Sequence, residues 1–227
     1  MVDPRDTTKV MSWTTRAVVL LLPLVLIVVA IPHLIDGVAF ENAFPVPVYT
    51  EMNVSMPRNA YVAAANALAQ GMLRDGDRDV MLAEAEANGG VAQSAILSTV
   101  ESGLAQAPTS PRGWTLLAEE LSRTDRKHAG EALTVALTLA PNDYYLLGRM
   151  ERDAAYLWDD LPSDARDVAV NAAPTLWKVP ELRIYIRPVL AMRAGPKLIT
   201  SGFKFDPEEL RAMNRWVTEQ RLEEGAQ

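Results

Sequence analysis

The stretch WTLLAEELSRTDRKHAGEALTVALTLAP, residues 114–141, decides the fold of this chain. Apolar residues and alanines recur at intervals of three and four residues on both sides of the polar turn SRTDRKH. That spacing places them on one face of a helix. We therefore expect two helices, over residues 111–123 and 126–140, and Pro141 is a plausible stop for the second.

The same type of pattern continues through the rest of the chain after Arg58. Glycines and prolines interrupt this pattern at Gly76, Gly89-Gly90, Pro108, Pro162, Pro174, Pro180 and Pro196. Between these breaks the spacing predicts helices over 58–73, 77–88, 91–106, 143–159, 163–173, 181–193 and 207–222. Only the short run Ile184-Tyr185-Ile186 alternates as a strand would. The predicted fold class is all-α, with residues 58–227 as one helical domain.

The central pair of helices carries a recognisable pattern, Trp114-x2-Leu117-Ala118-x2-Leu121 followed by Ala129-x3-Leu133-x2-Ala136-x4-Pro141. It resembles a tetratricopeptide repeat, a helical hairpin of about 34 residues in which small residues let the second helix approach closely. A preceding unit matches at Ile96, Val100, Gly103 and Pro108, whereas a following unit would put Glu151 in a slot for a small residue. The resemblance covers residues 91–143. It implies a small superhelix whose groove binds peptides or protein segments.

A wider resemblance covers residues 110–180. It includes Trp114, the run Leu139-Ala140-Pro141-Asn142-Asp143-Tyr144, Leu157-Trp158, Leu161, Arg166 and Trp177. In these spacings the chain is similar to small tetratricopeptide-like proteins found with bacterial exopolysaccharide and O-antigen polymerisation machinery. That resemblance implies an accessory component of envelope assembly and not an enzyme.

A candidate transmembrane helix precedes the helical domain. Residues 17–35, AVVLLLPLVLIVVAIPHLI, carry no formal charge and are long enough to cross a hydrocarbon layer of about 30 Å. A cleaved signal peptide would have a shorter apolar core. Pro23 and Pro32 each remove a backbone donor inside the span, so they predict either a kinked helix that contacts other membrane helices or an ordinary anchor that tolerates proline.

The flanking charges predict the orientation of this anchor. Arg5, Lys9 and Arg16 precede the span, and the first charges after it are acidic, which leaves residues 1–16 in the cytoplasm. The expected location is the bacterial inner membrane, with the helical domain in the periplasm. Residues 36–57 contain several prolines and show no helical period, so we expect an extended tether there.

Composition excludes several classes of function. The chain has 227 residues and no cysteine, so it is neither a disulfide scaffold nor a cysteine-dependent enzyme. Its 22 basic and 29 acidic residues give a net charge of −7, which disfavours nucleic acid as a partner. No nucleotide-binding, serine-hydrolase or zinc motif occurs. We therefore expect no enzymatic activity, no cofactor and no metal.

Isolated polar residues have structural explanations. His128 is expected to be a solvated turn residue, because no carboxylate and pocket are apparent to make it a general base. Adjacent acidic residues such as Glu119-Glu120 point about 100° apart on a helix and are expected to be solvated. Asp206 can cap the last helix with Pro207 in its first turn, and that helix carries an apolar stripe of Leu210, Met213, Trp216 and Val217.

Aromatic residues and arginines gather between residues 144 and 187 and form the best binding candidates. We expect Tyr145, Arg149 and Arg152 to be exposed and to contact a partner. Trp158 and Trp177 fit either a partner-binding surface or, as the favoured interpretation, the core. Pro23 and Pro32 are the corresponding candidates for partner contacts in the membrane.

Three functional hypotheses follow. The leading one is a non-catalytic, single-pass membrane scaffold whose periplasmic domain holds membrane or periplasmic proteins together for polysaccharide synthesis or export. The second is a structural accessory subunit of a large respiratory or photosynthetic membrane complex. The third is a carbohydrate-binding domain, for which polysaccharide would be the ligand.

Overall fold

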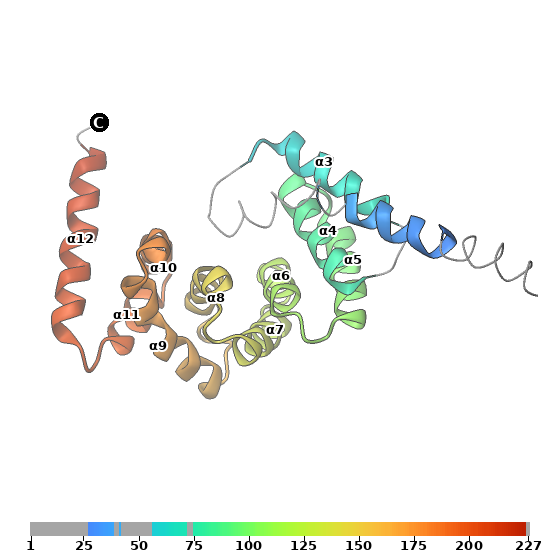
Figure 1. Ribbon diagram of the computed structural model, residues 1–227. Helices are drawn as coiled ribbons and strands as arrows, with labels where there is room; N and C mark the ends of the chain where they lie inside the picture. The colour runs from blue at the N-terminus through green and yellow to red at the C-terminus, as the bar shows by residue number, and fades with distance from the viewer. Residues whose placement is uncertain (1–26, 39–40, 42–55, 72–74, 226–227) are drawn as a thin grey trace, which may run out of the picture.

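All regular secondary structure in the described part of the chain is helical. The computed structural model describes residues 27–38, 41, 56–71 and 75–225 (Figure 1). The helices after residue 56 are α3 (Arg58–Ala69), α4 (Gly76–Gly89), α5 (Gln93–Gln106), α6 (Pro111–Leu121), α7 (Arg126–Leu139), α8 (Tyr144–Tyr156), α9 (Ser163–Lys178), the 3₁₀ helix η1 (Pro180–Tyr185), α10 (Ile186–Ala191), α11 (Gly195–Gly202) and α12 (Pro207–Gly225). The prediction of an all-α fold is confirmed for these residues.

Polar side chains fix where many of these short helices begin. At each of five helix starts, a side-chain oxygen accepts a hydrogen bond from a backbone N–H group of the first turn, a group that the helix itself leaves unpaired. The accepting residues are Asp75, Ser110, Asp125, Asp143 and Asp206. The predicted cap at Asp206 is thereby confirmed. Gly90 ends α4 with a φ of 75°, a conformation that favours glycine.

Consecutive helices pack as pairs, and the pairs stack into an arc. The closest pairs are α3 with α4, α4 with α5, and α6 with α7. α6 also contacts α4, α5 and α8, so the pairs join through neighbouring helices. Figure 1 shows α6 and α8 on the inner side of the arc and α7 and α9 on its outer side. The inner side is the concave face of the molecule.

Small and branched apolar residues fill the space between the pairs. Ala118, Ala129 and Ala136 are fully buried, and their short side chains allow α6 and α7 to approach closely. Leu133 and Leu137 of α7 are also fully buried, and burial of each stabilises the fold by about 1.5–3 kcal/mol. One continuous core extends in this way from α4 to α12.

The helix prediction was wrong around Pro174. This proline was expected to end a helix at residue 173, but α9 continues through it to Lys178. The missing N–H group of Pro174 leaves a carbonyl without its helical donor, and α11 packs against this place. A side chain on Gly202 would collide with the carbonyl oxygen of Val170 and approach the ring of Pro174. Tertiary packing against a glycine therefore accommodates the proline.

The region after Pro180 is divided into shorter helices than predicted. The expected helix over 181–193 consists of η1 and α10, and α11 was not predicted at all. The alternating run at residues 184–186 is not a strand either, since Ile184 is exposed while both Tyr185 and Ile186 are buried. These helices are too short for their apolar residues to show a clear helical period in the sequence.

The last helix packs its predicted apolar stripe against one end of the core. Met213 and Val217 of α12 are buried against the core, whereas Arg211 and Arg215 are exposed. The rings of Trp177 and Trp216 lie 5.9 Å apart, and Trp177 Nε1 donates a hydrogen bond of 2.5 Å to Glu209. The amphipathic character expected of this helix is confirmed.

Only residues 27–35 of the predicted membrane anchor are among the described residues. Residues 1–16 and Pro23 lie outside them. Residues 27–38 are helical, include Pro32, and expose Ile27, Val28 and Leu34. Within the described residues, no helix is both long enough and apolar enough to span a bilayer. Of the predicted tether at 36–57, residues 36–38 continue this helix, and Arg78 of α4 forms a 3.3 Å ion pair with Asp36. Residues 39–40 and 42–55 lie outside the described part.

Replacement of Gly148 by alanine tests the close approach of η1 to α8. A Cβ atom there would overlap the ring of Tyr185, which is buried and cannot move aside, so we expect G148A to lower the free energy of unfolding by about 1–3 kcal/mol. Urea unfolding followed by tryptophan fluorescence measures this. In the control G89A the new Cβ lies 3.5 Å from Val62, an ordinary contact, so stability should stay equal or rise. Equal effects of the two variants would contradict this packing.

Candidate functional site

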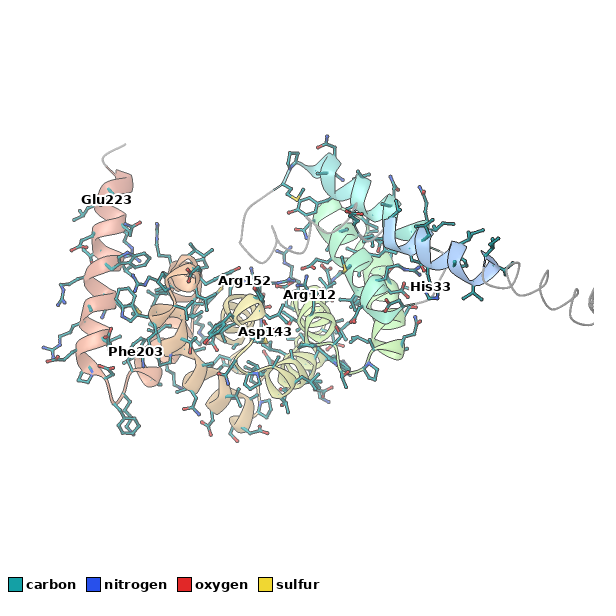
Figure 2. The ribbon with its side chains drawn as sticks, in the orientation of Figure 1. His33, Arg112, Asp143, Arg152, Phe203 and Glu223 are labelled. Carbon is teal, nitrogen blue, oxygen red and sulfur yellow. The ribbon has the colours of Figure 1, made fainter. Side chains whose placement is uncertain are left out.

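The concave face carries a network of charged side chains from three consecutive inner helices. Glu84 comes from α4, Arg112 and Glu119 come from α6, and Arg149, Arg152 and Asp153 come from α8. We refer to these six residues as the charge ladder. Figure 2 shows Arg112 and Arg152 on the inner side of the arc.

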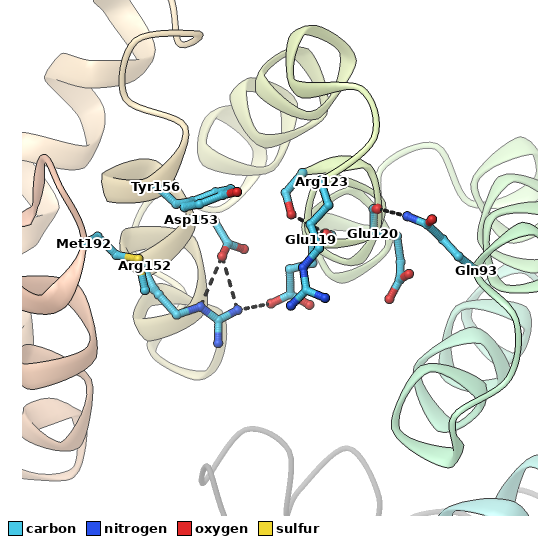
Figure 3. Close-up of a pocket in the computed structure, with 9 residues that line it drawn as sticks. Gln93, Glu119, Glu120, Arg123, Arg152, Asp153, Tyr156 and Met192 are labelled. Atoms are coloured by element: carbon cyan, nitrogen blue, oxygen red, sulfur yellow. Dashed lines mark hydrogen bonds and ion pairs between the residues drawn. The ribbon is translucent and has the colours of Figure 1, made fainter.

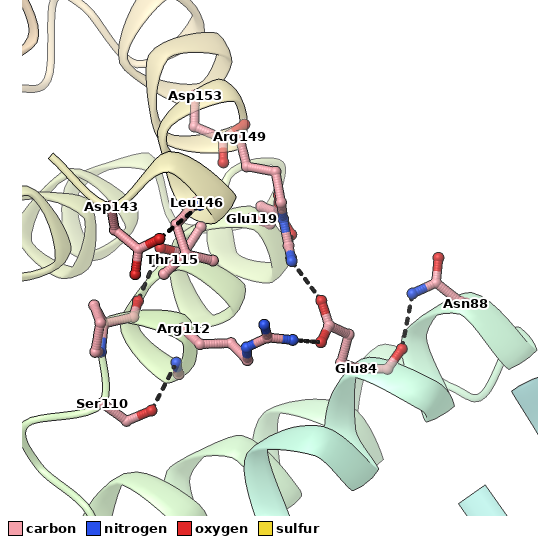
Figure 4. Close-up of polar contacts among 12 residues, drawn as sticks. Glu84, Asn88, Ser110, Arg112, Thr115, Glu119, Asp143, Leu146, Arg149 and Asp153 are labelled. Atoms are coloured by element: carbon pink, nitrogen blue, oxygen red, sulfur yellow. Dashed lines mark hydrogen bonds and ion pairs between the residues drawn. The ribbon is translucent and has the colours of Figure 1, made fainter. Parts of the chain in front are cut away.

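Arg149 is the centre of the charge ladder. Its Nη1 donates to Glu84 Oε1, while its Nε and Nη2 donate to the two carboxylate oxygens of Glu119 at 3.0 and 2.6 Å. Arg112 Nη1 donates to the other oxygen of Glu84 at 2.9 Å (Figure 4). The side chain of Arg149 is only 6 % exposed and that of Glu84 only 1 %. These bonds connect α4, α6 and α8 through a single buried guanidinium.

Arg152 extends the ladder toward solvent. Its Nη2 donates to Glu119 Oε1 at 2.7 Å, and its Nε donates to Asp153 Oδ1 at 3.2 Å. Its side chain is 35 % exposed, far more than that of Arg149. The ladder is therefore most buried at Glu84 and Arg149 and most accessible at Arg152.

Burial and charge shift the pKa values in opposite directions along the ladder. Burial raises the pKa of Glu84 despite its contact with Arg149. Burial also acts to raise the pKa of Glu119, but Arg149 and Arg152 outweigh it and hold that pKa below its usual value. Burial, followed by the charge of Glu119, raises the pKa of Asp153 to about 7. The carboxylates thus differ in character: Glu119 is a fixed anion, and Asp153 titrates near neutral pH.

A cavity of about 760 Å³ opens beside the accessible end of the ladder (Figure 3). Glu119, Arg152 and Asp153 line one part of it. The remaining lining residues are Gln93, Glu120, Ser122, Arg123, Tyr156 and Met192. A smaller cavity of about 280 Å³ shares Glu119, Glu120 and Arg152 with it and reaches Asn88 and Tyr185. The two cavities therefore lie next to each other, on either side of these shared residues.

The structure places the predicted partner-binding residues in different surroundings. Tyr145 is 67 % exposed, as predicted, but Arg149 is buried, so its predicted exposure is wrong. Arg149 is buried because its guanidinium pairs with the carboxylates of Glu84 and Glu119 on two other helices. Trp158 and Trp177 are buried in the core, the favoured interpretation. Arg149 and Arg152 lie together on the concave face, whereas Tyr145, Trp158 and Trp177 line neither cavity.

Sequence reasoning missed four members of the ladder, namely Glu84, Arg112, Glu119 and Asp153. The expectation that Glu119 is a solvated helix-face charge is wrong, because two arginines of α8 bind its carboxylate. The spacing of three of these residues along the sequence could have indicated that they share a face. Glu119 follows Glu84 by 35 residues and Asp153 follows Glu119 by 34, close to the period of about 34 residues in this type of helical repeat.

His128 lies at the start of α7 rather than in the turn before it. Its side chain is exposed, and its Nδ1 lies 2.5 Å from Asp125 Oδ2. The hydrogen bonds from His128 hold the pKa of Asp125 below its usual value. Within the described residues, no group of three or more acidic or histidine side chains is placed to hold a metal ion.

Comparison with family models, with curated proteins and with solved structures found no match to this chain. The site is therefore interpreted from its own geometry.

Substitution of Arg149 by methionine tests the central ion pairs. Methionine keeps much of the side-chain volume but leaves Glu84 and Glu119 without their shared partner, and breaking a buried ion pair costs about 3–5 kcal/mol. We expect a loss of that size in urea unfolding. The control R211M removes an arginine whose pair with Glu208 is exposed and 3.8 Å long, and it should change stability by less than about 1 kcal/mol. A small loss for R149M would contradict a structural role for the ladder.

Replacement of Glu151 by methionine tests a buried carboxyl that lies outside the ladder. Glu151 is fully buried, neither of its oxygens has a hydrogen-bond partner in the described structure, and burial raises its pKa well above the usual value. The unfolded chain releases this proton near pH 4.5 and the folded chain does so only at higher pH, so wild-type stability falls as pH rises above that point. E151M should therefore be more stable than wild type at pH 8, by about 1–3 kcal/mol.

The stability difference between E151M and wild type should shrink as pH falls to 4.5, where the carboxyl is neutral in the folded chain and half-protonated in the unfolded chain. Urea unfolding of both proteins from pH 4.5 to 8 measures it. A difference that grows on acidification would contradict the buried, protonated state of Glu151.

Proposed function

We propose that this protein is a non-catalytic scaffold whose concave face binds a segment of a partner protein. The observation that carries the proposal is the cavity of about 760 Å³ beside the charge ladder, on the inner side of an arc of paired helices. Arrays of helical pairs bury a core between neighbours and leave an extended concave surface, which such proteins use for binding. The resemblance of residues 91–143 to tetratricopeptide repeats supports the same interpretation.

The state of the carboxylates favours binding over catalysis. Glu119, Glu120 and Asp153 line one cavity, and two carboxylates at a suitable separation could serve glycoside hydrolysis. Both oxygens of Glu119, however, accept hydrogen bonds from arginines, which weakens it as a base or nucleophile. That removes Glu119 from the free carboxylates that this chemistry needs.

The wider biological role is part of the same proposal. The apolar run at 17–35 would anchor the chain in a bacterial inner membrane and leave the helical domain in the periplasm. The resemblance of residues 110–180 to proteins of polysaccharide polymerisation supports a role in holding together components for polysaccharide synthesis or export. Its partners would then be membrane or periplasmic proteins.

Charge reversal on the two faces of the arc tests the binding role. Glu120 is half-buried and lines the cavity, so the charge reversal E120R should reduce by at least about tenfold the partner recovered with the full-length protein from native membranes in mild detergent. Crosslinking mass spectrometry measures the recovery. The control K127E changes an 81 % exposed side chain on the outer helix α7, so it should retain the partner. A wild-type monomer with no co-purifying polypeptide would refute the scaffold.

A further inference from the structure

One buried carboxylate oxygen beside the cavity has no partner. Asp153 is 7 % exposed; its Oδ1 accepts from Arg152, but no donor in the described structure reaches its Oδ2. Buried carboxylate oxygens are almost always hydrogen-bonded, so such an exception indicates a missing donor. Asp153 lines the cavity together with Glu120 and Tyr156 (Figure 3). The torsion that turns an aspartate carboxylate is broad, so a small rotation directs Oδ2 toward an incoming group.

The charges around the cavity favour a cation as that group. Its lining contains three carboxylates, Glu119, Glu120 and Asp153, against the two guanidiniums of Arg123 and Arg152. Glu119 already binds Arg149 and Arg152, so those cations are largely neutralised. Burial, followed by the charge of Glu119, raises the pKa of both Glu120 and Asp153. A further positive charge beside these two carboxylates would relieve that repulsion.

We propose that this cavity is a subsite for a lysine side chain of the bound protein segment, with Asp153 as its counterion. This inference rests on the proposed function and adds the chemistry of the partner. The ammonium group would donate to Asp153 Oδ2 and lie near Glu120, while its methylene stem would pack against Met192 and Tyr156.

Lysine fits this subsite better than arginine for a geometric reason. A guanidinium binds a carboxylate best through two parallel hydrogen bonds, which require both oxygens. Arg152 already occupies Oδ1 of Asp153, so one oxygen remains. A compact ammonium is satisfied by a single strong acceptor of this type.

The most direct test uses n-butylammonium, which reproduces the lysine side chain, with the full-length protein. The ε-methyl NMR signal of Met192, assigned with the variant M192L, reports binding in the cavity. We expect a saturable shift of this signal with n-butylammonium. n-Butanol and n-butylguanidinium should bind at least about tenfold more weakly, since the first lacks the charge and the second needs two oxygens.

Two matched variants assign the binding to Asp153. D153N removes the counterion with little change in shape, and it should weaken n-butylammonium binding by at least about tenfold. D159N changes the same residue type at an exposed position, where the carboxylate pairs loosely with Arg193 at 3.8 Å, and should bind as wild type does. Y156L keeps the carboxylate but removes the ring against which the methylene stem packs, so it should weaken n-butylammonium binding relative to wild type, which D159N should not do. This variant tests the subsite independently if D153N proves unfolded by circular dichroism.

The pH dependence gives a second readout. The charged groups that act on Asp153 are Glu119 from α6 and Arg149 and Arg152 from α8, and the neighbouring Met192 is uncharged. Protonation of Asp153 as pH falls from 8 to 6 should weaken n-butylammonium binding. D153N should show no such dependence.

Three results would overturn the lysine subsite. These are no saturable shift with wild type, equal binding by D153N, and binding of n-butylguanidinium as tight as that of n-butylammonium. The scaffold itself is judged separately. If D153N retains the membrane partner while E120R loses it, the concave face binds a protein segment but without a lysine at Asp153.

Discussion

Arg149 connects the three inner helices on which the rest of the structure depends. Its buried guanidinium donates to Glu84 of α4 and to both oxygens of Glu119 of α6, while its own backbone belongs to α8. A buried charge is tolerated only when such partners surround it, so the helices can stack in few other registers. The ladder therefore fixes how consecutive pairs of helices sit on each other, and this arrangement gives the concave face its shape.

The same network separates a structural end of the concave face from a binding end. At Glu84 the ions are buried and every carboxylate oxygen has a partner, which stabilises one arrangement. At Arg152 and Asp153 the network reaches a cavity, and one carboxylate oxygen lacks a donor. Continuity between the two ends means that a ligand at Asp153 would meet a carboxylate held in position by the packing of α6 and α8.

Local chemistry made much of the helical architecture predictable. The caps at Asp125 and Asp143 and the break at Pro141 depend on neighbouring residues, so the boundaries of α7 and α8 could be estimated from sequence. The charge ladder could not be predicted in this way. Its bonds between helices join residues 28 to 65 positions apart, and an exposed helix face and a buried ionic face have similar composition. Arg149 and Glu119 were consequently assigned to solvent.

The sequence by itself determined an all-α chain of short capped helices with an apolar stripe on each long one, because helix formation and amphipathic spacing are local properties. Only the tertiary structure decided which polar side chains became buried, since that depends on which helix faces meet. Pro174 illustrates the same limit. By itself it predicts a helix end, yet packing of Gly202 against the interrupted turn lets α9 continue to Lys178.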